Sequence, residues 1–193
     1  MWYKRSDDRA IQPRRAHPYD AGLDLFALED VHVRPGEVLR VRTGIHIANY
    51  PTSVALYWDK SGRASHGLTI LGGCIDGPYR GELEIVVANV NIRSTLDFLQ
   101  FQIENLVEHR SIPLDRYEFM LQKVVTATVT VPYGKALTQV LVVNSVINES
   151  DDAVHDQIPG LDFPELNELS PNQFDELFGK TLRGEKGFSS SDQ

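Results

Sequence analysis

Short runs of alternating apolar and polar residues cover most of the first half of the chain and return after residue 125. The runs are residues 23–28, 31–36, 38–47, 53–58, 81–90, 126–131 and 137–146. Turn residues such as Pro35-Gly36 and Tyr50-Pro51 separate them. Alternation with a period of two predicts half-buried strands. Many short strands without a strand–helix–strand rhythm predict an all-β sandwich, jelly roll or barrel.

Residues 93–123 break this rhythm. The apolar residues at helical spacing are Leu96, Leu99, Ile103, Leu106 and Val107, with Phe98 and Phe101 widening the stripe. This predicts a helix capped by Ser94 or Thr95, and Pro113 then separates it from a second helix or strand. We expect a packed insertion that covers an edge of the sheet, with binding of a protein partner as the alternative.

Residues 148–181 are rich in Asn, Asp, Glu, Ser and Pro and predict a surface connection. One short helix is expected near residues 170–178, with Ser170 as its cap and Pro171 in its first turn. Residues 183–193 are polar and contain glycine. The prediction is therefore one β domain over residues 1–182, followed by a distinct terminal motif over 183–193.

Composition narrows the class of protein. The 193 residues suffice for one well-filled core, and 41% hydrophobic with 24% charged residues is ordinary for a globular protein. A net charge of −8 argues against a polynucleotide ligand, although local cations, amides and a metal can still hold a small anion. The absence of a long apolar run, the absence of a secretory signal and a single cysteine, Cys74, predict a cytoplasmic protein that does not contact membranes, in the host cytoplasm if it is viral.

The candidate chemistry lies in residues 72–82, GGCIDGPYRGE, where a carboxylate, an aromatic ring and an arginine stand between glycines. Taken alone, Asp76-Gly77-Pro78 predicts a plain β-hairpin turn. The functional interpretation is a nucleoside slot formed by the backbone and the Tyr79 ring, with Asp76 facing a reactive water. Residues 60–68 form a small-residue turn whose Lys60 and Arg63 suit phosphate oxygens, or else an exposed loop.

Five segments, residues 21–27, 59–68, 72–82, 134–142 and 183–191, occur in the order of the five motifs of the homotrimeric dUTPase family, and the chain resembles that family. The resemblance implies a jelly-roll or distorted β-barrel subunit with a C-terminal lid arm. It implies hydrolysis of dUTP to dUMP and pyrophosphate by Mg²⁺-assisted attack of water on the α-phosphorus. Each site would combine motifs from three subunits. The insertion at 93–123 resembles one that some bacteriophage members carry before the fourth motif.

The third motif carries the implied catalytic residue. Asp76 matches the general base, a role that suits a carboxylate because it stays ionised at neutral pH while accepting a proton from water. Gly73, Ile75 and Tyr79 match the nucleoside-binding positions. The Tyr79 ring would leave no room for a ribose 2′-hydroxyl, and the backbone from Gly73 to Tyr79 would read the uracil edge.

The remaining motifs imply the phosphate and lid contacts. The positions that match phosphate-binding residues are Lys60, Ser61, Gly62 and Gln139. Asp24 matches an acid that reaches the metal only through water, because Mg²⁺ on a triphosphate keeps most of its water ligands. In the lid, Arg183 matches the γ-phosphate cation and Phe188 the ring over uracil, and Gly187 and Ser190 complete the motif.

Some positions depart from the family pattern. Lys60 stands where arginine is usual and loses its planar fork, and Asp59 replaces a proline and adds negative charge near the phosphates. Lys135-Ala136 replaces an acid and a base, and Ser189 replaces a glycine.

Two other functions stay open. One is a related enzyme, such as a dCTP deaminase or another deoxynucleotide hydrolase. The other is a nucleotide-sensing regulatory protein whose insertion binds a partner. For three further residues we expect structural roles: His66 in loop packing, Trp58 in the core, and Cys74 as a small buried apolar side chain.

Overall fold

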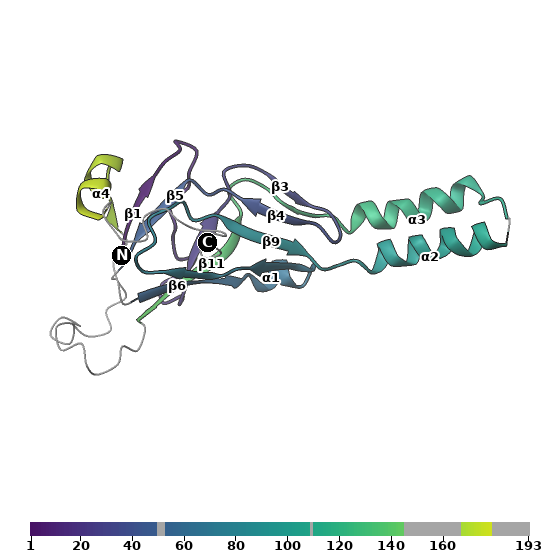
Figure 1. Ribbon diagram of the computed structural model, residues 1–193, viewed down its shortest axis with the longest axis horizontal. Helices are drawn as coiled ribbons and strands as arrows, with labels where there is room; N and C mark the ends of the chain where they lie inside the picture. Colours follow the sequence, from purple (N-terminus) through teal and green to yellow (C-terminus); the bar gives the residue numbers. More distant parts are fainter. Residues whose placement is uncertain (50–52, 109, 145–166, 179–193) are drawn as a thin grey trace, which may run out of the picture.

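Four small sheets make up the β domain of the computed structural model, which describes residues 1–49, 53–108, 110–144 and 167–178 (Figure 1). The largest sheet has the order β2 (Leu23–Phe26), β11 (Ala136–Asn144), β6 (Ser53–Asp59) and β8 (Cys74–Asp76). A second sheet contains β4 (Val38–Val41), β9 (Ile85–Asn89) and β7 (Leu68–Leu71). The others pair β3 (Val31–Val33) with β10 (Val129–Val131), and β5 (Ile45–Ala48) with β1 (Trp2–Arg5) and β12 (Asn167–Glu168).

The predicted all-β fold is confirmed, although the described strands do not close into a single barrel. Neighbouring strands run antiparallel except β1 and β12, which are parallel. The run 38–47, predicted as one strand, is two strands in different sheets. Gly44 between them has φ +68°, and a Cβ there would lie 2.9 Å from the Cβ of Ala10. The chain therefore turns sharply at a position that favours glycine.

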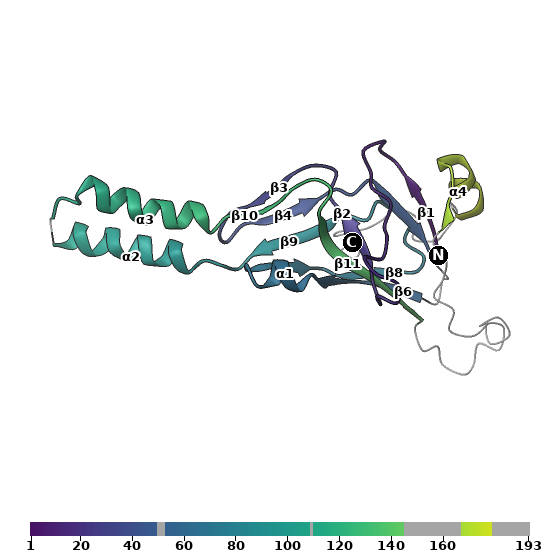
Figure 2. The ribbon, with the colours of Figure 1, turned by 180° about the vertical axis from the view of Figure 1, so that it is seen from behind.

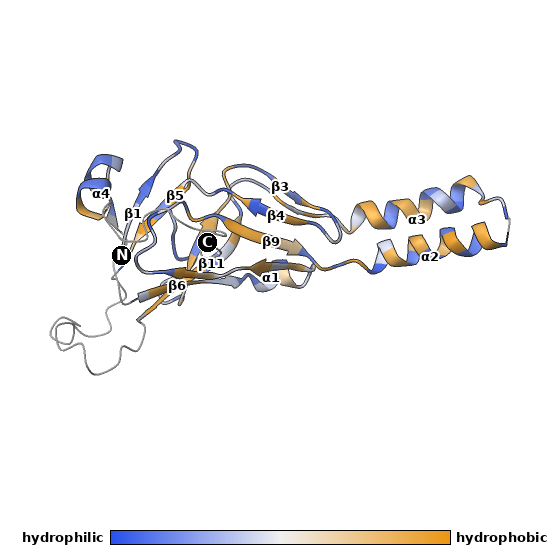
Figure 3. Cartoon of the chain, viewed as in Figure 1, coloured by the Kyte–Doolittle hydropathy of each residue, from blue (hydrophilic) through white to orange (hydrophobic). Residues whose placement is uncertain are grey.

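The core lies between these sheets and draws apolar side chains from all of them. Side chains with at most 1% exposure include Tyr3, Leu25, Val33, Ile45, Ile85, Val87, Val131 and Leu137. In Figure 3 the hydrophobic colour lies on several strands of the β domain, including β6 and β9, whereas β1 and β4 are largely hydrophilic. Burying the apolar side chains is the main favourable contribution to folding. Within the described residues, no helix combines the length and apolar character needed to cross a bilayer.

The insertion forms a helical hairpin of α2 (Arg93–Val107) and α3 (Leu114–Thr126), which projects away from the β domain (Figures 1 and 2). The expectation that it covers a sheet edge is therefore wrong. The two helices pack on each other through Phe98 and Tyr117, whose ring centroids are 5.4 Å apart. The N-cap of α2 is Ile92, without a side-chain cap, so the predicted Ser94 or Thr95 cap is also wrong.

Helix α4 (Pro171–Phe178) confirms the short helix predicted near residues 170–178. The Ser170 hydroxyl accepts from the Gln173 amide at 3.3 Å, and the Gln173 side chain accepts from the Ser170 amide at 3.1 Å. This reciprocal pair is a capping box. Phe174 is 1% exposed and fastens α4 to β1. Residues 148–166 and 179–181 of the predicted surface connection, and the terminal motif 183–193, lie outside the described residues.

Candidate functional site

Three of the predicted phosphate-side residues meet at one end of the largest sheet. Gln139 on β11 stands opposite Asp24 on β2, and Lys60 directly follows β6. Lys60 Nζ lies 2.5 Å from Asp24 Oδ1, and Gln139 Nε2 donates to the same oxygen at 3.4 Å. Asp24 is only 8% exposed, so its carboxylate depends on these two donors. Asp24 and Gln139, which are 115 positions apart in sequence, are thus in direct contact. We call Asp24, Lys60 and Gln139 the phosphate-side cluster.

Ser61 and Gly62 continue directly from this cluster into α1 (Ser61–Ala64), and both are exposed. The Lys60 carbonyl accepts from the amides of Arg63 and Ala64 at 2.7 and 2.9 Å. His66 Nδ1 lies 2.9 Å from the Gly62 carbonyl oxygen. His66 therefore holds the turn together, and the loop-packing role predicted for it is confirmed.

Asp59 has a role that the sequence did not indicate. One carboxylate oxygen accepts from the Ile70 amide at 2.7 Å and the other from the Thr69 hydroxyl at 3.2 Å. Its charge is thus engaged with β7, which links two sheets.

Trp58 corrects another expectation, because it is 56% exposed and does not belong to the core. It stands directly opposite Gln139, which in turn stands opposite Asp24. Directly paired residues in antiparallel strands point to the same face of the sheet. An exposed indole therefore shares the face of the phosphate-side cluster.

The predicted hairpin is present at the other end of β6. Asp76 ends β8, is exposed, and pairs with Val54. Its carbonyl accepts from the Tyr79 amide at 3.0 Å, which closes the turn. Ile75 packs against the core, and the Gly73 carbonyl accepts from the Tyr57 amide at 2.8 Å. Cys74 is exposed, so the expectation that it is buried is wrong.

Tyr79 is 9% exposed and is fixed by its own turn. Its hydroxyl donates to the Glu82 carbonyl at 3.2 Å. A Cβ added at Gly81 would lie 2.2 Å from that hydroxyl oxygen and 2.4 Å from the ring carbon that bears it. The ring therefore rests directly on the backbone of Gly81, which only glycine permits.

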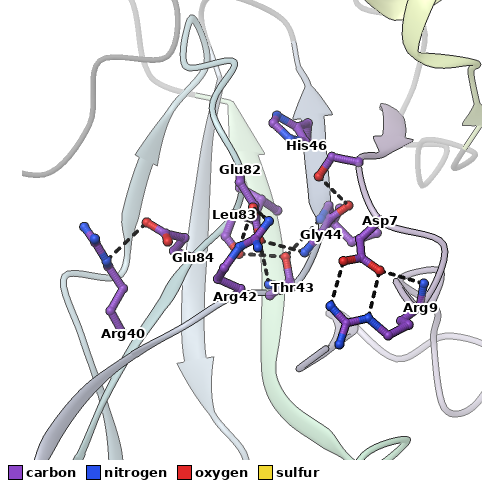
Figure 4. A network of polar contacts seen from close by, with 12 residues as sticks. Asp7, Arg9, Arg40, Arg42, Thr43, Gly44, His46, Glu82, Leu83 and Glu84 are labelled. Atoms are coloured by element: carbon purple, nitrogen blue, oxygen red, sulfur yellow. Dashed lines mark hydrogen bonds and ion pairs between the residues drawn. The ribbon is translucent and has the colours of Figure 1, made fainter. Parts of the chain in front are cut away.

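Glu82 anchors the hairpin to the β4–β5 corner (Figure 4). One carboxylate oxygen accepts from the amides of Thr43 and Gly44 at 3.0 and 2.8 Å, and the other accepts from Arg42 at 2.8 Å. Burial alone would raise the pKa of Glu82, but the bonds from Arg42 and the two amides outweigh it and lower the pKa. Sequence reasoning did not single out this residue, although its place inside the third motif was a signal.

The two halves of the predicted site do not meet within one chain. Asp76 stands opposite Val54, whereas Gln139 stands opposite Trp58 on the same strand. Four residues along a strand and three strand spacings across the sheet place Asp76 roughly 20 Å from Asp24. The lid residues Arg183, Gly187, Phe188 and Ser190 lie outside the described residues.

Asp24 is the carboxylate of the phosphate-side cluster that could act on a bound magnesium ion. Across the described ranges, no group of three or more His, Cys, Asp or Glu side chains could hold a metal ion. Asp24, with one oxygen engaged by Lys60 and Gln139, fits a contact through a metal-bound water better than a cage of direct ligands.

Sequence comparison matches part of the chain to known proteins. Residues 8–96 match the sequence model of the dUTPase family. This range contains the segments 21–27, 59–68 and 72–82, and the segments 134–142 and 183–191 lie beyond it. The chain is 44% identical to the deoxyuridine 5′-triphosphate nucleotidohydrolase of Thermobifida fusca over 46% of its length, and 43% identical to that of Clostridium acetobutylicum over 45%. The aligned parts span only 51% and 61% of those relatives.

Solved structures with the same fold include dUTPases of viruses. A mutant dUTPase from the Staphylococcus aureus phage phi11, described with a structural Mg(II) ion, has a TM-score of 0.56 at 22% identity and covers 83% of this chain and 96% of its own. A dUTPase of the Staphylococcus bacteriophage 80alpha, described as controlling transfer of virulence genes, has a TM-score of 0.56 at 20% identity, covering 84% and 97%. The dUTPase of EIAV has a TM-score of 0.51 at 19% identity, covering 81% and 98%.

Proposed function

We propose that this chain, whose residues 8–96 match the dUTPase family model, hydrolyses dUTP to dUMP and pyrophosphate. The observation that carries the proposal is the convergence of Asp24, Lys60 and Gln139 on one oxygen, at a position suited to a triphosphate. The hairpin with Asp76 and the fixed Tyr79 ring supplies the matching nucleoside half.

Each half has a distinct task in this reaction. Asp76 is exposed and accepts a proton from the water that attacks the α-phosphorus. The Tyr79 ring packs under the deoxyribose and rejects a 2′-hydroxyl, while the backbone of Gly73 to Tyr79 pairs with uracil. Lys60, Gln139 and the turn at Ser61 and Gly62 hold the phosphates. Mg²⁺, when bound to the triphosphate, offsets the charge of the leaving pyrophosphate.

The roughly 20 Å between Asp76 and Asp24 supports a shared site. The hairpin of one chain works with the phosphate-side cluster of a neighbour, in a homotrimer. The terminal residues Arg183, Gly187, Phe188 and Ser190 then close over the nucleotide as a lid.

Product analysis tests the reaction. We expect the full chain with Mg²⁺ to release pyrophosphate from dUTP much faster than from dCTP, dTTP or UTP. Asp76→Asn should lower kcat by at least about 100-fold, since it removes the proton acceptor. Truncation after residue 182 should lower the rate as well. Release of ammonia or preference for dCTP would favour the deaminase alternative.

Mixing two variants, each damaged in a different half of the site, tests the shared site at dUTP concentrations below the parental KM. Asp76→Asn destroys the nucleoside half, and Lys60→Met damages the phosphate half. Trimers assembled from equal amounts should regain about a quarter of the parental activity, because a quarter of shared sites receive both intact halves. If each site lay within one chain, mixing would restore nothing.

The helical hairpin supports a second function, binding of a protein partner. Leu96, Leu99, Ile103 and Leu106 are 47–75% exposed and follow the 3-4-3 spacing of a coiled-coil seam. Phe98 and Phe101, by contrast, turn toward α3, where they contact Tyr117 and Arg116. Exposed apolar stripes of this kind mark interaction surfaces. The gene-transfer role described for the 80alpha protein supports a regulatory partner here as well.

Two variants would separate this function from hydrolysis. Leu99→Lys with Ile103→Lys should abolish partner binding, measured by co-purification with the candidate partner, and leave dUTP turnover unchanged. Asp97→Lys with Glu104→Lys alters the charge of α2 at positions outside the stripe and serves as the control. Equal loss of binding in both pairs would point to charge rather than to the stripe.

A further inference from the structure

Arg80 is a buried cation without a carboxylate partner among the described residues. It is 6% exposed and immediately follows Tyr79. One guanidinium nitrogen, Nη1, donates to the carbonyls of Gly77 and Tyr79 at 2.5 and 2.7 Å. Nε donates to the carbonyl of Phe178 at 3.1 Å, and the guanidinium carbon lies 6.0 Å from the Phe178 ring centroid.

These contacts compensate for a costly position. Removing a charge from water is unfavourable unless hydrogen bonds replace the lost hydration. Burial lowers the pKa of Arg80 from its ordinary value, in line with that cost. Hydrogen bonds to an ionised donor are stronger than neutral ones, so three carbonyls can hold the guanidinium although no described carboxylate pairs with it. Arginine has the planar set of donors that is needed to bond carbonyls of two separate segments at once.

The carbonyls belong to two segments that are distant in sequence. Gly77 and Tyr79 form the turn that our proposal assigns to nucleoside binding. Phe178 is the last residue of α4 and follows Arg80 by 98 positions. The final carbonyls of a helix lack partners within the helix and carry partial negative charge. Arg80 supplies both a donor and a positive charge at that point.

Helix α4 is itself firmly held. Phe174 is 1% exposed and packs near Phe178, with ring centroids 5.6 Å apart. Trp2 lies 5.3 Å from the Phe178 ring, and Lys4 forms an ion pair with Asp175. The turn is therefore tied through Arg80 to a helix that is anchored on β1.

We propose that Arg80 is a positioning residue for the deoxynucleoside, which fixes the carbonyls of the 77–79 turn by fastening them to the end of α4. Helix α4 is then part of the support of the nucleoside half. This inference rests on the proposed function. We call the contacts of Arg80 with Gly77, Tyr79 and Phe178 the clamp. The clamp serves the binding of base and sugar, not the phosphates or proton transfer.

The test compares Arg80→Lys, Phe174→Ala and Arg40→Lys in the full chain. Lysine keeps the charge but cannot reach both segments, and Phe174→Ala loosens α4 while leaving Arg80 in place. Each of the two should raise the Kd of dUMP, measured by calorimetry, and the KM of dUTP by about 10-fold, with kcat changed less than about 3-fold. The double variant should lose little more than either single one, because both act through one clamp. Arg40, in an exposed ion pair with Glu84, is the control and should change nothing.

The outcomes separate this inference from the proposed function. If the parent neither binds dUMP nor hydrolyses dUTP, the proposed function fails and the clamp falls with it. If the parent binds dUMP and a folded Arg80→Lys binds it equally well, the clamp is wrong while the function stands. Should Arg80→Lys fail to fold, unchanged dUMP affinity in Phe174→Ala, with altered Trp2 fluorescence as proof that α4 has moved, would overturn the inference. A loss confined to kcat would overturn it too.

Discussion

Lys60 Nζ and Asp24 Oδ1 form an ion pair of 2.5 Å that joins the second and first motif segments. The Lys60 and Asp24 side chains are 25% and 11% exposed, so the pair is largely shielded from solvent. A lysine at this position thus has an internal partner before any nucleotide arrives. An incoming phosphate would compete with Asp24 for the same ammonium group, and that competition makes the pair a measurable determinant of affinity.

Lys60→Met should raise the KM for dUTP by about 10-fold or more, because it removes a charge-assisted contact to phosphate. Lys60→Arg should keep or improve the KM, since arginine retains the charge and adds a planar fork. Steady-state kinetics with Mg²⁺ measure both. Lys123→Met, on α3, is the matched control. An unchanged KM in Lys60→Met would exclude Lys60 from phosphate binding.

Trp58 should report on events at the phosphate-side face. Nucleotide or a neighbouring chain that covers this exposed indole should shift its fluorescence to shorter wavelength. The chain contains two tryptophans, and Trp2 is stacked near Phe178. The shift should therefore vanish in Trp58→Phe and persist in Trp2→Phe. The reverse pattern would assign the change to the α4 region.

Two buried tyrosines should respond oppositely to loss of the hydroxyl group. Tyr3 donates to Glu168 at 2.9 Å, and burial together with that bond raises the pKa of Tyr3 to about 12. The Tyr57 hydroxyl has no partner among the described residues. Tyr3→Phe should lower the free energy of unfolding by about 1 kcal/mol, and Tyr57→Phe should raise it by a similar amount. Urea unfolding measures both changes, and a loss of stability in Tyr57→Phe would reveal a partner for its hydroxyl.

Acid should weaken the fold through Glu82 and Glu168. Burial would raise the pKa of each carboxyl, but hydrogen bonds from Arg42 and two amides to Glu82, and from Arg5 and Tyr3 to Glu168, lower both below the ordinary 4.5. A carboxyl whose folded pKa is lowered stabilises the protein fully above its unfolded pKa, and this contribution is lost as the pH falls through the folded value.

The corresponding measurement is the free energy of unfolding between pH 7 and pH 3. Stability should decline below about pH 4.5, and Glu82→Gln should flatten that decline while lowering stability at pH 7. Glu37→Gln, at a half-buried carboxyl that accepts from the Arg34 amide, is the comparison variant. An equal slope in Glu82→Gln and the parent would remove Glu82 from the acid response.

The period-two pattern predicted seven strands, and six of these regions contain a single strand each, because their inner faces form the core. It failed at residues 38–47, where the chain turns at Thr43 and Gly44 into a different sheet. The amides of this corner donate to Glu82, which lies 39 and 38 residues away in sequence. The hairpin at 93–126 was predicted in part. Helical spacing marked α2, but no local pattern indicates whether an apolar stripe packs on the same chain or faces outward.

Some residues of the candidate site were predicted from the sequence, and others were not, because their contacts depend on the fold. The resemblance named Asp24, Lys60 and Gln139, and the structure brings them together. Trp58 looked like a core residue because apolar type alone does not say which face of a strand is covered. Asp59, Arg80 and Glu82 each bond to a different element of the structure, so only the fold reveals their contacts. The roles in catalysis and the intracellular location stay predictions.

Gly81 lies under the Tyr79 ring, at a distance that no Cβ can share. Every amino acid other than glycine carries that atom, so no missense change at codon 81 is conservative. Alanine, elsewhere a mild replacement, would push the ring out of place as surely as a larger residue. If a replicating genome depends on the proposed activity, variation at codon 81 should be limited to synonymous changes.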